Sequence, residues 1–159
     1  MAPIDYRQRF LRLLENIGSD QEYSLHQSAR TNSSRPLAIP QMAVELIIDS
    51  QIVRVTHAMD GQRASIVFIE CRLGRAREAD ELSVHGKLLS TNYAMSAHRE
   101  SVFSIDPINE DIIYTLSCSL DDAEPDHFAQ SVFSAAALIP SWRTQLRLVE
   151  SLDGSITFP

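Results

Sequence analysis

A helical segment in the middle of the chain, residues 79–95 (ADELSVHGKLLSTNYAM), constrains the fold most, because strand-like segments lie on both sides of it. Its large apolar side chains recur at near-helical spacing, with a glycine leaving a flat position among them: Leu82, Gly86, Leu88, Leu89 and Tyr93. A helix that covers one sheet needs one apolar stripe. This segment carries more than one, so we expect part of it to contact something outside the domain.

An amphipathic helix is predicted for residues 5–17, with Asp5 as its cap, Gln8 completing a capping box and Gly18 ending it. One face of this helix is apolar and is formed by Tyr6, Phe10, Leu13, Leu14 and Ile17. Residues 19–41 are rich in Ser, Asn and Gln and predict a long loop.

Three strands are predicted next, around residues 44–48, 52–59 and 64–73, with turns at Asp49-Ser50 and Asp60-Gly61. Alternation places one apolar set on a single face: Val53, Val55, Val67, Ile69 and Cys71. The opposite face is also partly apolar and carries Ile52, Arg54, Thr56, Ile66 and Phe68. A sheet open to water is normally polar on one side, so we expect this second face to be covered in part.

Two further strands, residues 100–105 and 111–119, precede an acidic loop and a last helix that Pro140 should kink or break. The order is α-βββ-α-ββ-α. It predicts an α+β fold in which a twisted antiparallel sheet is flanked by three helices. We expect one domain over residues 1–159, with residues 151–159 as a loosely held tail.

The formal net charge of −7 and the sequence pI of about 5.1 argue against nucleic acid and against anionic membrane surfaces as partners. No segment resembles a secretory signal or a membrane span. The two cysteines, Cys71 and Cys118, fall inside strands and are expected to be small buried side chains in a reducing compartment.

Residues that could carry catalysis do not cluster. The five histidines lack metal-ligand spacing, and a mid-strand Cys71 is a poor nucleophile. The acidic residues at 121–126 suit a helix start, and the arginines at 72–77 suit a solvated turn or a contact for a partner. We therefore expect a binding protein and not an enzyme, without metal or cofactor.

Several local patterns, taken in this order, resemble the class I (CesT-like, or Tir chaperone) family of type III secretion chaperones. The central helix carries paired leucines followed by asparagine, Leu88-Leu89-Ser90-Thr91-Asn92. The segments 101–106 (SVFSID) and 112–116 (IIYTL) are similar to the last two strands of the family. The final helix resembles the family's in ending near a tryptophan-arginine pair, Trp142-Arg143.

The resemblance implies a homodimer in the bacterial cytoplasm that binds the amino-terminal segment of a secreted effector. It would keep that segment extended without ATP hydrolysis, and the secretion ATPase is a further candidate partner. The surplus apolar surface of residues 79–95 then predicts a dimer interface through Leu82, Gly86, Leu88, Leu89 and Tyr93. The predicted effector-binding residues are Phe10, Leu13, Leu14, Ile52, Arg54, Ile66 and Phe68.

Two alternatives remain at the level of sequence. The helix residues Phe10, Leu13 and Leu14 could instead form the protein's own core. The whole domain could instead be a cytosolic adaptor or regulatory domain that binds a folded protein partner.

Overall fold

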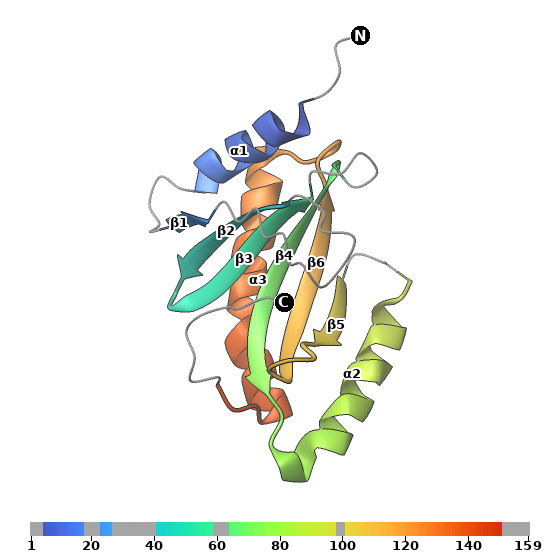
Figure 1. The fold of residues 1–159 in the computed structure, drawn as a ribbon. Coiled ribbons are helices and arrows are strands. Elements are labelled where there is room, and N and C mark those ends of the chain that lie inside the picture. The colour runs from blue at the N-terminus through green and yellow to red at the C-terminus, as the bar shows by residue number, and fades with distance from the viewer. Residues whose placement is uncertain (1–4, 18–22, 27–40, 59–63, 98–100, 151–159) are drawn as a thin grey trace.

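The computed structural model describes residues 5–17, 23–26, 41–58, 64–97 and 101–150. The helices are α1 (Tyr6–Ile17), α2 (Glu81–Met95, preceded by a 3₁₀ turn at Glu78–Asp80) and α3 (Pro125–Leu146). The strands are β1 (Tyr23–His26), β2 (Gln41–Ile48), β3 (Gln51–Ala58), β4 (Ile66–Arg75), β5 (Ser101–Ile105) and β6 (Asp111–Ser119). The predicted order of helices and strands is confirmed, with β1 as an addition (Figure 1).

All strand pairs are antiparallel, in the order β1-β2-β3-β4-β6-β5. The prediction of an uninterrupted loop over residues 19–41 is wrong at Tyr23–His26, which pairs with β2. A strand of four residues is too short to show a period-two pattern, and it forms because β2 offers a backbone to pair with. The rest of that predicted loop, the turn at Asp60-Gly61 and the tail at 151–159 lie outside the described residues.

The turn between β2 and β3 follows the prediction at Asp49-Ser50. Both residues have positive φ, 48° and 65°. Two consecutive left-handed residues are the signature of a type I′ hairpin, whose twist matches that of the flanking strands. The turn therefore fixes the register in which Val44 faces Val55.

The core lies between one face of the sheet and α3, which runs behind the strands in the view of Figure 1. The predicted core face is confirmed, since its five members are fully buried: Val53, Val55, Val67, Ile69 and Cys71. The helix contributes Val132, Ala135 and Ile139 from its inner side. α1 packs against α3, and α2 packs against β5 at the far edge of the sheet.

The last helix does not break at Pro140, one of the two predicted outcomes; α3 continues to Leu146 and is capped by Arg147, which has a left-handed φ of 53°. Proline removes one helical hydrogen bond. Tertiary contacts hold the following turn in place. The Trp142 ring meets Phe103 edge-on with centroids 4.8 Å apart, and Arg143 Nε donates to the carbonyl of Leu73 at 2.9 Å.

Candidate functional site

The central helix α2 presents apolar side chains on two separate sides. Val84 and Leu88 are buried in the protomer. Leu82, Leu89 and Tyr93 are 88%, 70% and 85% exposed. Together with the exposed Gly86 these three residues follow a spacing of four, three and four, which places them on one side of a helix. We call Leu82, Gly86, Leu89 and Tyr93 the outer stripe of α2.

Leu88 corrects the predicted dimer interface, because it belongs to the hydrophobic core and is only 5% exposed. Successive helical residues are about 100° apart around the axis, so two neighbouring leucines can point to different surroundings. Leu88 packs inward and Leu89 outward. The predicted set therefore keeps four members on the outer stripe.

Asn92 ties α2 to the edge strand β5. Its Nδ2 donates to the carbonyl of Phe103 at 2.9 Å, and its Oδ1 accepts from the Phe103 N–H at 2.8 Å. The side-chain amide thus takes the place of a neighbouring strand at this point of the edge strand β5. The sequence motif included Asn92 without a role. The structure shows that it docks α2 with the outer stripe facing away from the sheet.

The predicted effector-binding residues of α1 need correction. Phe10 and Leu13 are 0% and 2% exposed, and the Phe10 ring packs 5.2 Å from the His57 ring. Leu14 is half-buried. The apolar face of α1 covers the end of the core beside α3, so Phe10 and Leu13 cannot reach a partner in this conformation.

The start of α1 is tied to the loop before α3. The Tyr6 hydroxyl donates to Asp121 Oδ1 at 2.8 Å, and this hydrogen bond raises the pKa of Tyr6. Arg9 donates to the Asp121 carbonyl at 3.1 Å. The predicted capping of α1 by Asp5 is confirmed, since Asp5 Oδ1 accepts the Gln8 N–H at 3.1 Å.

The remaining predicted effector-binding residues are brought together on the sheet face that points away from α3. Ile52, Arg54, Ile66 and Phe68 are all half-buried there. Arg54 lies opposite Glu70, and Phe68 lies opposite Thr56. Ile47 pairs with Ile52 and is 50% exposed, so it extends this face. Its position between the buried Leu46 and Ile48 is the sequence signal that could have placed it there. We call these residues, with Ile47, the second sheet face.

The carboxylate of Glu70 lies on the same side of the sheet, opposite Arg54 of the second sheet face. Burial raises the pKa of Glu70, while the charge of Arg54 and a hydrogen bond from Thr56 Oγ1 at 3.1 Å act in the opposite direction. This face therefore offers an extended polypeptide both apolar contacts and charges of either sign.

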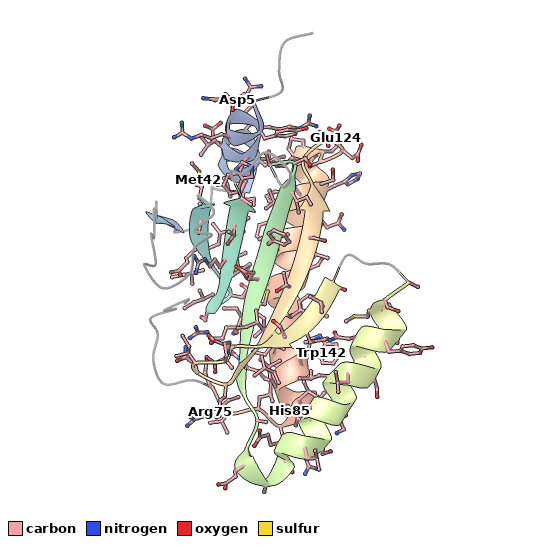
Figure 2. The ribbon with its side chains drawn as sticks, turned by 45° about the vertical axis from the view of Figure 1, so that its right-hand side comes forward. Asp5, Met42, Arg75, His85, Glu124 and Trp142 are labelled. Atoms are coloured by element: carbon pink, nitrogen blue, oxygen red, sulfur yellow. The ribbon has the colours of Figure 1, made fainter. Side chains whose placement is uncertain are left out.

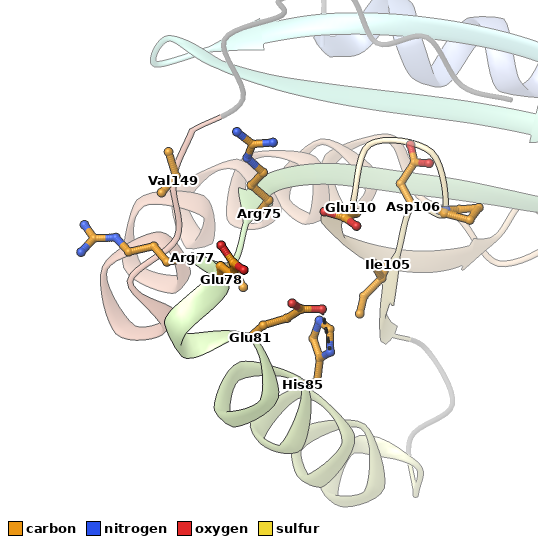
Figure 3. Close-up of a pocket in the computed structure, with 11 residues that line it drawn as sticks. Arg75, Arg77, Glu78, Glu81, His85, Ile105, Asp106, Glu110 and Val149 are labelled. Carbon is orange, nitrogen blue, oxygen red and sulfur yellow. Dashed lines mark ion pairs between the residues drawn. The ribbon is translucent and has the colours of Figure 1, made fainter.

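A cavity of about 730 Å³ at the base of α2 brings together residues that are far apart in the sequence (Figure 3). His85 Nδ1 lies 4.0 Å from Glu81 Oε1 there. Arg75 and Arg77 line the cavity, whereas Arg72 pairs with Asp111 at 3.3 Å. The three arginines of residues 72–77 therefore do not form one patch: two line the cavity, and Arg72 pairs with Asp111.

Two observations bear on chemistry. Burial raises the pKa of Cys71 to about 12, so its thiol stays protonated and unreactive at neutral pH. Among the described residues, no group of three or more His, Cys, Asp or Glu side chains is placed to hold a metal ion. Within the same ranges, no helix has the length and apolar character needed to cross a membrane.

The arrangement of helices and strands matches the fold found in two solved structures, the ExsC–ExsE complex and the HopA1–SchA chaperone–effector complex. The chain matches the ExsC–ExsE complex with a TM-score of 0.51 and 15% identity, over 69% of this chain and 79% of that chain. It matches the HopA1–SchA chaperone–effector complex with a TM-score of 0.50 and 13% identity, over 91% of this chain and 98% of that one. No protein-family model matches, and no curated protein does. The likeness confirms the predicted fold.

Proposed function

We propose that this protein is a cytoplasmic chaperone of bacterial type III secretion that binds the amino-terminal segment of an effector and keeps it extended without ATP hydrolysis. The observation that carries the proposal is the likeness to the HopA1–SchA chaperone–effector complex, which spans 91% of this chain and 98% of that one. A fold alone does not set a function. Two surfaces of the domain, the second sheet face and the outer stripe of α2, supply the additional support.

The second sheet face is the proposed effector-binding surface. An extended segment presents side chains alternately to two sides, so every second residue can rest on a surface of this kind. Ile52, Ile66 and Phe68 offer apolar contacts, and Arg54 with Glu70 offers charges. The segment can also add to the sheet edge, where β1 is the outermost strand.

The outer stripe of α2 is the proposed dimer interface. Single exposed leucines are ordinary, but Leu82, Leu89 and Tyr93 form a row that is at least 70% exposed. A two-fold dimer buries the same patch on both subunits, so a row of this kind can cover itself.

Co-expression with an effector fragment that aggregates alone tests the function. We expect the chaperone to keep the fragment soluble, with the bound segment extended and protected from protease. Ile52→Asp should weaken this binding at least tenfold. Ile108→Asp is the matched control, because Ile108 is 63% exposed on the turn between β5 and β6. Binding to a folded partner only, with no effect on the aggregating fragment, would favour an adaptor instead.

A further inference from the structure

A groove of about 750 Å³ runs between α2 and the last turns of α3. Its α2 wall includes the small residues Ser83, Gly86 and Ser90, and its α3 wall includes Trp142 and Leu146. Figure 2 shows Trp142 on the side of α3 that faces α2. Gly86 lines this groove and also belongs to the outer stripe, so the two surfaces are continuous.

The two surfaces have complementary shapes. At about 100° per residue, the side of α2 with Ser83, Gly86 and Ser90 lies next to the side with Leu82, Leu89 and Tyr93. The side with the small residues forms a depression, and the side with the large residues projects from the helix. Large side chains on one helix pack into depressions on a facing helix when both kinds of surface are available.

Gly86 is not required by the protomer. A Cβ at this position would meet nothing within 4 Å, and its φ is not in the left-handed range. A glycine in a helix interior weakens the helix, so its presence here lacks an explanation within one chain. The absent side chain keeps the groove open towards the outside.

Two hydroxyls of the α2 wall, those of Ser90 and Thr91, are compatible with an apolar occupant. Ser90 Oγ donates to the Gly86 carbonyl at 3.0 Å, and Thr91 Oγ1 donates to the Lys87 carbonyl at 2.8 Å. Both hydroxyls are satisfied by the helix itself. An apolar side chain entering the groove therefore leaves neither of them without a hydrogen bond.

The area needed for a stable dimer points to the same groove. Leu82, Leu89 and Tyr93 together expose roughly 500 Å² per protomer, since each is at least 70% exposed and an aromatic side chain offers on the order of 150–250 Å². A standard interface buries about 800 Å² per partner. The outer stripe must therefore be extended by adjoining surface, and the groove adjoins it at Gly86.

We propose that the groove between α2 and α3 receives apolar side chains from the outer stripe of a second copy of this chain. The assignment rests on the proposed dimer and places its contacts on both helices. Each protomer then supplies a raised row and a groove, as a two-fold interface requires.

Trp142 is the only tryptophan of the 159 residues and lines the groove, so its emission reports occupancy directly. In a dilution series, we expect acrylamide quenching of Trp142 to be at least twofold weaker in the dimer than in the monomer. The change should share its midpoint with the mass measured by light scattering. A dimer in which Trp142 is as accessible as in the monomer would overturn the groove assignment and leave the dimer standing.

Gly86→Leu fills the groove at its junction with the outer stripe. Circular dichroism should show a folded protomer, because the new Cβ meets nothing, while the dimer dissociation constant rises at least tenfold. Gln8→Leu, on an exposed position of α1, should leave the dimer unchanged. An unchanged dissociation constant for Gly86→Leu would overturn the assignment. So would a result in which Trp142 is protected from acrylamide only after an effector fragment is added. A protein that is monomeric at every concentration would contradict both the dimer and the groove.

Discussion

The helices α1 and α2 use their apolar residues in opposite ways. α1 has one apolar face, and the protomer buries it through Phe10, Leu13 and Ile17. α2 has two, of which Val84 and Leu88 are buried and the outer stripe is exposed. When a helix has a single apolar stripe, as α1 does, the domain buries that stripe in its own core. The second stripe is the better indicator of a partner.

The largest expected effect comes from α1. Phe10→Ala should lower the free energy of unfolding by about 3–5 kcal/mol, because it removes a fully buried ring and leaves a cavity. Urea unfolding followed by circular dichroism measures the loss. Leu14→Ala, on the half-buried side of the same helix, should cost clearly less. If Phe10→Ala keeps its stability and loses effector binding, Phe10 contacts the effector and not the core.

The two neighbouring leucines of α2 should separate stability from association. Leu88→Ala should cost about 2–5 kcal/mol of unfolding free energy, since the core loses a buried side chain. Leu89→Ala should change it by about 0.5 kcal/mol or less when measured on monomers at high dilution. Equal losses for the two variants would show that α2 is not two-sided in this way.

Asn92 links the two sides of α2. Asn92→Ala should cost about 1–3 kcal/mol, because it leaves the N–H and the carbonyl of Phe103 without their partner. Hydrogen exchange at the Phe103 amide should become faster. Lys87→Ala, at an exposed position of the same helix, should leave that amide protected. Unchanged exchange in Asn92→Ala would mean that α2 is held by its apolar contacts alone.

The smallest expected effect concerns the second sheet face. Burial raises the pKa of Glu70 above its ordinary value of 4.5, so the folded state holds this proton more tightly than the unfolded state does. Its contribution to stability is complete below pH 4.5 and is lost as the pH rises through the raised pKa. The free energy of unfolding of Glu70→Gln, taken relative to that of the parent protein, should therefore be higher at neutral pH than at acidic pH. Parallel pH profiles for the two proteins would contradict this.

Much of the fold could be predicted because its signals are local. Alternation placed Val53, Val55 and Val67 on the buried face, and Asp49-Ser50 marked the turn. β1 could not be predicted from four residues, because its partner strand and not its own sequence makes it a strand. Pro140 inside α3 is tolerated through the distant contacts of Trp142 and Arg143.

The candidate site was harder to predict than the fold. The second sheet face followed from counting residues along strands, and the outer stripe followed from helical spacing. The inward position of Leu88 depends on how Asn92 docks α2 against β5, which sequence does not reveal. The groove at Trp142 requires α2 and α3 to approach each other, although these helices are separated by two strands in the chain.

Light scattering after gel filtration tests the central claim that the outer stripe of α2 joins two copies. At micromolar concentration, the parent protein should have twice the chain mass of 17.8 kDa. Leu89→Asp should have the mass of one chain and retain its circular dichroism, because Leu89 is exposed in the protomer and a dimer would bury an unpaired carboxylate. Leu138→Asp, on the outer side of α3, should remain a dimer. A parent protein with the mass of one chain, or a Leu89→Asp variant that is still a dimer, would contradict the account.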